Sequence, residues 1–294
     1  MDLNEKARNV IPVLVTFSKN LIQLARDVIE ESGKKGFKDD NHIGFMSFAF
    51  LCRQIENLES MLCLVKVKKF KSAAIIARSS LEGTALLLWA ANKPQKRAYK
   101  WRCFVVLEDY WRFKEMLEKN EKIDKKDFDE IESAFIEIGH LFLTKKAKTK
   151  MAKTKKETID PDSILENDFH KNWYDGKKIS DIFEEVKGGD REILYKYHYK
   201  RISNIIHWNP SGLATSIETN EDRIQFTSKK CFNFGALALS CGFQSLIQTL
   251  SVYNMSLNLA FEKKIEELNE QYILAVYELY GLTEEEIEIV EESQ

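Results

Sequence analysis

The chain has 294 residues, of which 44% are hydrophobic and 31% are charged, and its formal net charge is only -2. Glycine (12) and proline (4) are scarce, which argues against a turn-rich all-β chain and against collagen-like or disordered chains. The near-neutral charge means that any contact with nucleic acid is local, because no basic field surrounds the whole molecule.

Apolar residues recur at helical spacing through the first half of the chain. The pattern predicts helices over residues 10–31, 42–67, 70–91, 94–120 and 125–143. Pro12 fits the first turn of the first helix, or it separates a short leading turn from that helix. The segment 70–91 is apolar almost all round, which indicates a helix buried among other helices.

The second half mixes helices with less regular segments. Residues 145–156 hold seven lysines and no acid, so we expect a solvated, lysine-rich loop there. Further helices are predicted over residues 190–206, 229–261 and on to Tyr280, followed by an acidic tail at 284–294. A change of period near residues 214–227 predicts one small β-hairpin. We therefore expect an all-α fold, a multi-helix bundle that forms a single helical domain over residues 1–294.

The sequence contains no pattern that indicates a metal site, a cofactor site or a membrane span. The five cysteines are widely spaced without a CxxC pair, and the histidines show no metal-ligand spacing. Phosphate-binding glycine loops and nucleophile elbows are missing, so we expect neither a metal nor a cofactor. The N-terminus does not resemble a signal peptide, and the longest apolar stretch, 85–91, is too short to cross a bilayer. A cytoplasmic protein without membrane contact is expected.

The segment YKYHYKRISNIIHWNP, residues 195–210, carries the strongest chemical signal. On a helix, Tyr197, Lys200, Asn204 and His207 share one face, and Arg201 lies beside it. His207 is expected near the C-terminal end of the helix, where the dipole favours imidazolium and suits the side chain to acid–base work. Arg201 can hold a phosphate and stabilise charge that develops on it.

This polar ridge supports more than one interpretation. In the first, Arg201, His207 and Asn204 cleave RNA without a metal, through attack of the 2′-hydroxyl on the adjacent phosphorus, with Lys200 and Tyr197 binding substrate. In the second, His207 caps the helix and Arg201 pairs with an acid. The ridge of a non-catalytic binding or sensor protein would then contact a partner or a small ligand. The lysine-rich segment could follow an RNA backbone or remain a solvated loop.

Arg78 and Glu82 lie four residues apart in the apolar segment 70–91. Because unpaired charges are costly to bury, they either form a structural ion pair or line a pocket near the Arg201 helix. The order Arg before Glu is the less favourable one within a helix, which favours partners elsewhere. As pocket residues they would join substrate binding, or hold a small ligand in a third, purely ligand-binding interpretation.

Two resemblances extend these interpretations. The spacing of Arg201 and His207, R-x5-H, resembles the R-x4-6-H motif of the HEPN superfamily, although Ile202 stands where that family usually has a polar residue. This resemblance implies a helical, metal-independent ribonuclease that acts as a homodimer in toxin–antitoxin or phage-defence systems, with RNA and an antitoxin or defence protein as partners.

The chain is also similar to an uncharacterised bacterial family, the domain of unknown function five-six-seven-seven. The similarity rests on ARSSLEGTALLLWAANKPQKRAYKW, on Trp173 and Tyr174 with ISDIFEEV, and on YHYKRISNIIHWNPSG. It covers roughly residues 77–212 and implies a helical fold without an established activity.

Overall fold

The computed structural model describes residues 3–36, 38–153, 158–186, 198–200, 202–203, 217–220, 223–226 and 231–280. Most of this described part is helical, which confirms the expected all-α fold. The chain divides into two compact units, Met1–Asn92 with Ile179–Gln294 (unit 1) and Lys93–Lys178 (unit 2). The single domain expected over residues 1–294 therefore stays a prediction.

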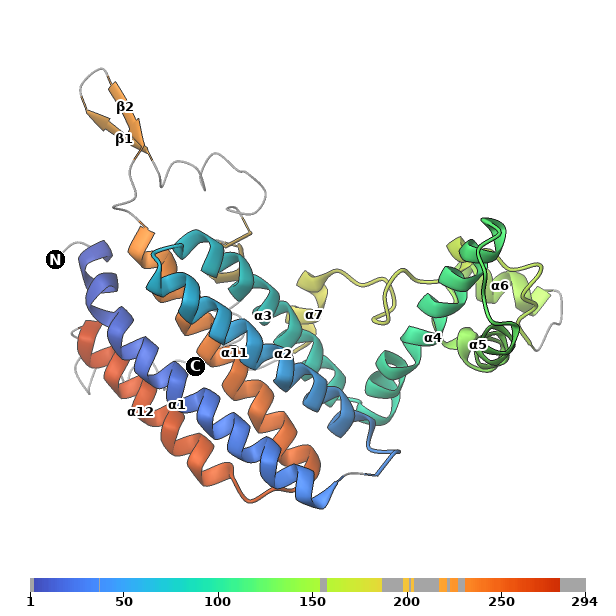
Figure 1. Ribbon diagram of the computed structural model, residues 1–294, viewed down its shortest axis with the longest axis horizontal. Helices are drawn as coiled ribbons and strands as arrows, with labels where there is room; N and C mark the ends of the chain where they lie inside the picture. Colours follow the sequence, from blue (N-terminus) through green and yellow to red (C-terminus); the bar gives the residue numbers. More distant parts are fainter. Residues whose placement is uncertain are drawn as a thin grey trace. The chain divides into compact units, whose positions relative to one another are not determined.

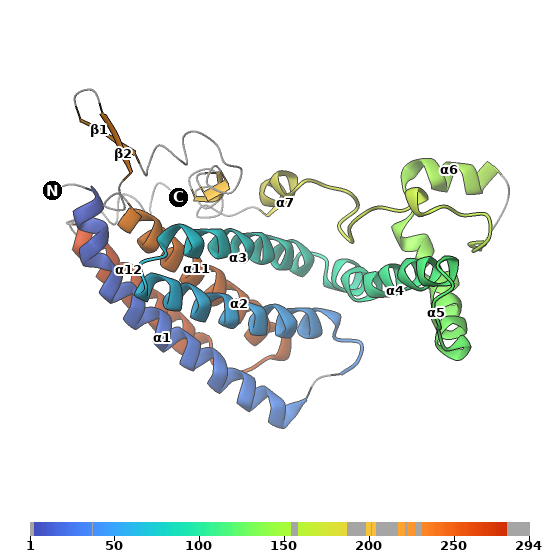
Figure 2. The same ribbon diagram turned by 45° about the horizontal axis from the view of Figure 1, so that its top comes forward.

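Unit 1 is a bundle of long helices. Its helices are α1 (Leu3–Lys35), α2 (His42–Lys66), α3 (Phe70–Ala91), α7 (Ile179–Glu185), α11 (Phe232–Leu257) and α12 (Glu262–Tyr280). Figures 1 and 2 show α1, α2, α3 and α11 running side by side, with α12 along α1. Helix α11 packs against α1, α2 and α3, so it is the central helix of the bundle.

Close approach of α2 and α11 depends on a glycine. A Cβ atom at Gly242 would lie 2.5 Å from Met61 Cε and 2.8 Å from Leu58 Cδ1, which is too close for any larger residue without a shift. The missing side chain therefore lets α2 reach the backbone of α11. Leu58 and Met61 are both fully buried at this contact.

A polar layer crosses the core of the same bundle. The side-chain amide of Gln54 on α2 donates to the Ser80 carbonyl at 2.9 Å and to the Thr84 hydroxyl at 3.1 Å, both on α3. The Thr84 hydroxyl in turn lies 3.3 Å from the Ser245 carbonyl of α11. Because buried polar groups need partners, these bonds favour one relative alignment of the three helices.

Helix α1 is longer than the sequence indicated. It begins at Leu3, so Pro12 lies inside the helix and not in its first turn. Ala7, Val10 and Leu14 are nearly fully buried and follow one another on the face that meets the bundle. Burial of this stripe offsets the hydrogen bond that a proline removes from a helix.

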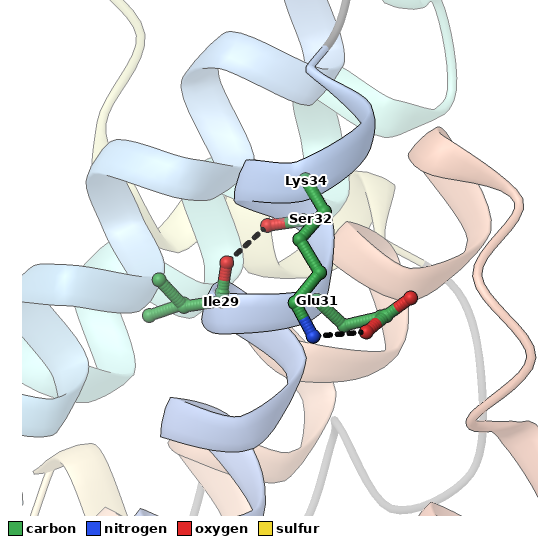
Figure 3. Close-up of polar contacts among 4 residues, drawn as sticks. All are labelled: Ile29, Glu31, Ser32 and Lys34. Carbon is green, nitrogen blue, oxygen red and sulfur yellow. Dashed lines mark hydrogen bonds and ion pairs between the residues drawn. The ribbon is translucent and has the colours of Figure 1, made fainter.

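The far end of α1 is joined to α11 by a buried hydroxyl pair. The Ser32 hydroxyl donates to the Ile29 carbonyl at 2.7 Å, as Figure 3 shows, and lies 2.5 Å from the hydroxyl of Tyr253. In the same figure, Lys34 forms an exposed ion pair with Glu31 at 3.0 Å. The carboxylate raises the pKa of Lys34, and the basic last turn suits the negative end of the helix dipole.

Two apolar helices are long enough for a bilayer. Although the uninterrupted apolar stretch at 85–91 is short, α3 and α11 as whole helices reach the length and hydropathy of a membrane span. In unit 1 both lie inside the bundle, and 56% and 67% of their apolar windows are buried. Core helices of a water-soluble bundle meet the same criteria, so the expected lack of membrane contact stays a prediction.

Unit 2 is built around an aromatic core. Its elements are α4 (Pro94–Glu118), α5 (Lys125–Ile138), the short 3₁₀ helices η1 (Gly139–Phe142) and η2 (Glu166–Asp168), and α6 (Lys145–Lys153). Tyr110 on α4 stacks on Phe135 of α5 with ring centroids 3.8 Å apart. Trp111 and Phe169 meet the same Phe135 ring at 5.9 Å and 5.5 Å. The aromatic residues of α4 thus pack against α5 and against the chain segment around Phe169.

The lysine-rich segment is partly a helix, which corrects the expected loop. Residues Lys145–Lys153 form α6, with the Thr144 hydroxyl accepting from the Ala147 amide at 3.2 Å. Ala147 is buried and Met151, one turn later, is half-buried. These two positions form a short apolar stripe on one face of the helix, which a prediction from the lysine content alone does not detect.

Two four-residue strands, β1 (Ile217–Asn220) and β2 (Arg223–Phe226), pair antiparallel with Ile217 opposite Phe226. They fall in the range 214–227, for which the sequence predicts a β-hairpin. The predicted acidic tail at 284–294 lies outside the described residues.

Candidate functional site

Three side chains from two distant parts of the chain meet on one face of α3. Arg78 and Glu82 form an ion pair, with Arg78 Nε 3.1 Å from Glu82 Oε1 and side-chain exposures of 20% and 32%. The Tyr199 hydroxyl donates to Glu82 Oε1 at 2.6 Å and accepts from Arg78 Nη2 at 2.9 Å. We call Arg78, Glu82 and Tyr199 the anchor cluster.

The aromatic ring of Tyr199 also contacts neighbouring side chains. The Arg78 guanidinium lies 5.0 Å from the ring centroid, a cation–π distance, and the Phe183 ring of α7 lies 5.6 Å away. Burial, together with the hydrogen bond to Glu82, raises the pKa of Tyr199 to about 12. The phenol therefore stays protonated at neutral pH, so Tyr199 acts as a hydrogen-bonding anchor and not as an acid or base.

The anchor cluster holds a helical segment of the chain against α3. Residues His198–Lys200 and Ile202–Ser203 are helical; Tyr199 is 9% exposed and Ile202 is fully buried. These two residues are three apart, so both lie on the inner face. Lys200, between them in sequence, is exposed. One side of this segment is thus fastened to unit 1 and the other faces solvent.

Helix α7 completes the wall against which Tyr199 packs. The indole N–H of Trp89, near the end of α3, donates to Glu185 Oε2 of α7 at 2.6 Å. Ile182 and Phe183 of α7 are buried against the bundle. The hydrogen bond and the apolar face together hold α7 along α3, where Phe183 reaches the Tyr199 ring.

The small-ligand interpretation of Arg78 and Glu82 gains little from the space around them. A cavity lined by Leu81, Gln248 and Phe183, whose ring contacts Tyr199, encloses about 20 Å³. That volume holds about one water molecule. Arg78 and Glu82 pair with each other, although their order is the less favourable one, and both also bind Tyr199, a partner outside α3.

Four residues of the predicted ridge, Tyr197, Arg201, Asn204 and His207, lie outside the described residues, so their roles stay predictions. Lys200 is described and is exposed, as a substrate-binding residue must be. Tyr199 was missed by the sequence reasoning. Its spacing of three from the apolar Ile202 was the available signal, since such a pair shares a helix face.

A second feature that suits an anionic ligand lies in unit 2. Helix α6 carries five exposed lysines and no acid: Lys145, Lys146, Lys148, Lys150 and Lys153. Several of them are three or four residues apart, so their ammonium groups repel one another. Lysines in its first turn also oppose the helix dipole. A bound polyanion would relieve both costs.

Metal ligands do not gather in the part of the chain that the structure describes. No group of three or more His, Cys, Asp or Glu side chains there could hold a metal ion. The described cysteines are free thiols.

Comparison with known proteins identifies the family of this chain. Residues 44–224, more than half of the 294, match a family of unknown function, DUF5677. The chain belongs to this family. The matched range includes most of α2 and all of α3, unit 2 and the anchor cluster, so the family region contains every contact of Tyr199 described above. No curated protein and no solved structure matches the chain.

Proposed function

We propose that this member of the family is a metal-independent endoribonuclease of HEPN type, with Arg201 and His207 at its catalytic centre. The observation that supports the proposal is the fastening of the segment around Arg201: Tyr199 and Ile202 are buried against α3 and α7, whereas Lys200 is exposed. A catalytic group gains most from a rigid support, because small misplacements cost large factors in rate.

The proposed reaction needs only side chains of this chain. The 2′-hydroxyl of a ribose attacks the adjacent phosphorus, and the bond from phosphorus to the 5′-oxygen breaks, which yields a 2′,3′-cyclic phosphate and a 5′-hydroxyl. His207 accepts the proton of the attacking 2′-hydroxyl and then gives it to the leaving 5′-oxygen, so one proton is transferred overall. Arg201 stabilises the negative charge that grows on the phosphate. Asn204 and Tyr197 orient the substrate, and Lys200 binds a neighbouring phosphate.

Within this proposal Arg78 and Glu82 act as positioning residues. Their charges are already engaged with each other and with Tyr199, so they act on substrate through the segment that they hold. The lysines of α6 would bind the RNA backbone, since five exposed ammonium groups in nine residues match a chain of phosphates. We further propose a cytoplasmic homodimer that acts as a toxin or phage-defence effector, with an antitoxin or defence protein as partner.

The test is cleavage of RNA in the presence of EDTA. We expect the wild-type chain to release products with 2′,3′-cyclic phosphate ends, and His207→Ala and Arg201→Ala each to lose at least about a hundredfold in rate. His140→Ala is the matched control, because His140 is exposed on η1 in unit 2, and should leave the rate unchanged. Cleavage that persists in His207→Ala at equal folding, or no cleavage of any RNA, refutes the proposal.

One observation favours a second candidate, a non-catalytic RNA-binding or sensor protein. Ile202 follows Arg201 directly, at the position that is usually polar in the resembling ribonucleases, and it is fully buried. That position therefore serves packing and cannot assist the chemistry. The binding candidate predicts RNA complexes, or complexes with a partner protein, that form without turnover and weaken in Lys200→Gln.

A further inference from the structure

Unit 2 contains a cavity that none of the proposed chemistry uses. It lies between α4 and the chain segment 166–171 and has a volume of about 620 Å³. Pockets that bind metabolite-sized ligands have volumes of roughly 300–1,000 Å³. All of its lining residues belong to unit 2, so the cavity is defined within one compact unit.

One wall of the cavity is aromatic. Phe104 and Trp111 of α4 and Phe169 of the returning segment line it, and the Trp111 and Phe169 rings meet edge to face at 5.9 Å. Aromatic faces attract cations through their quadrupole. The protein's own Lys114 ammonium already lies 5.3 Å from the Trp111 centroid, so a ligand would set its apolar body, and not its charged group, against this ring.

Acidic side chains outnumber basic ones among the residues that line the cavity, and most of these acids form no ion pair with a described residue. Arg112 pairs with Asp109 at 2.8 Å, and Lys114 donates to the Pro161 carbonyl at 3.0 Å. The lining carboxylates Glu108, Glu118 and Glu166 are exposed and form no ion pair among the described residues. Glu115 is the exception, since it pairs with Lys119 at 2.6 Å.

The remaining lining groups do not reverse this balance. Lys171 is exposed, and the bond of Lys114 to a neutral carbonyl leaves its charge uncancelled, so two positive charges stand against the three carboxylates. Burial lowers the pKa of His170, as do the nearby Lys100 and Lys148, although Asp175 acts in the opposite direction. Its imidazole is therefore mostly neutral near pH 7 and can donate or accept a hydrogen bond. The cavity thus combines an aromatic wall with a rim on which carboxylates outnumber cations.

We propose that this cavity binds a small organic cation whose ammonium group is attached to an aromatic or apolar body. The body packs against Phe104, Trp111 and Phe169, and the ammonium lies at the acidic rim, beside Glu108 or Glu166. A phosphate-bearing ligand would meet the wrong charge at this rim. The site is independent of RNA cleavage, so it stands or falls separately from the proposed nuclease.

Three probes with one ring system and different charges test the proposal on the full chain: tryptamine (cation), tryptophol (neutral) and indole-3-acetate (anion). By calorimetry at fixed ionic strength, tryptamine should bind at least about tenfold more tightly than tryptophol, and indole-3-acetate more weakly than either. The double variant Glu108→Gln, Glu166→Gln should lose about tenfold in tryptamine affinity. Glu121→Gln, an exposed acid outside the cavity, is the matched control and should keep it.

The outcomes decide the proposal in either direction. Equal or tighter binding of indole-3-acetate would show that the cavity selects anions and would overturn it. Unchanged tryptamine affinity in the double variant would place the probe elsewhere, with the same consequence. A lack of binding by all three probes up to about 10 mM also removes the proposal, because a metabolite site with this wall should hold an indole ring at that concentration.

Discussion

Removing one hydroxyl group, by Tyr199→Phe, should weaken the attachment of the segment 198–203 to α3. The phenol makes two hydrogen bonds to charged partners, to Glu82 at 2.6 Å and from Arg78 at 2.9 Å. Hydrogen bonds to charged groups contribute about 1.5–3 kcal/mol, and water regains part of this because the two side chains are 20% and 32% exposed. We expect a net loss of about 1–2 kcal/mol in the free energy of unfolding.

The substitution is selective because the ring stays in place. Phenylalanine keeps the packing on Phe183 and the cation–π contact with Arg78, so only the hydroxyl is tested. In thermal unfolding the midpoint should fall by about 2–8 °C for a unit of this size. A double-mutant cycle with Glu82→Gln should give a coupling energy of about 1 kcal/mol between the two positions.

A specific result would refute this reasoning. If Tyr199→Phe unfolds within about 0.3 kcal/mol of the wild type, the segment 198–203 is not fastened to α3 by the hydroxyl. Additive effects in the cycle would lead to the same conclusion even if each single variant is destabilised. The support for the proposed catalytic centre would then be lost together with the anchor.

Three further predictions concern other parts of the molecule. Because the folded-state pKa of His170 lies below its ordinary value of 6.5, the unfolded chain binds more protons and stability should fall as the pH drops through 6.5. The fall between pH 7 and pH 5, measured by urea unfolding, should be smaller in His170→Gln and unchanged in the exposed control His140→Gln. Replacing Lys145, Lys146, Lys148 and Lys153 of α6 by glutamine should make the salt dependence of RNA binding shallower by about 2–3 in log–log slope, whereas glutamine at the exposed Lys122, Lys125 and Lys126 should not. Fluorescence anisotropy across a salt series measures it, and an unchanged slope would exclude α6 from the RNA contact. Gly242→Ala should cost about 1–3 kcal/mol in chemical unfolding, because the new methyl group would lie 2.5 Å from Met61 Cε in a fully buried contact; a neutral effect would mean that the Met61 and Leu58 side chains can turn aside without loss of packing.

Helix existence was the part of the fold that could be predicted most closely. The apolar spacing predicted helices over 42–67 and 70–91, and the structure has them at His42–Lys66 and Phe70–Ala91. Periodicity succeeds here because one face of each helix must be buried whatever its neighbours are. It failed at α6, where Ala147 and Met151 supply too short a stripe to stand out among lysines.

The candidate site, too, could be predicted only in part. Arg78 and Glu82 could be singled out because charges are rare in so apolar a helix. Their shared partner, Tyr199, could not be predicted, because it lies 117 residues beyond Glu82 in the chain and only its local spacing indicated that it is buried. The cavity of unit 2 gave no local signal, because its aromatic wall and its carboxylates come from α4 and from a segment about fifty residues later.

The sequence by itself therefore determined that the chain is helical, where most helices lie and which residues are chemically unusual, because propensity and burial act over a few neighbouring residues. Only the tertiary structure decided which of those residues meet. In the structure, α1 continues on the N-terminal side of Pro12, part of the lysine-rich segment is a helix, and Tyr199 pairs with Arg78 and Glu82. Such outcomes depend on the free energy of contacts between distant segments, which no local pattern contains.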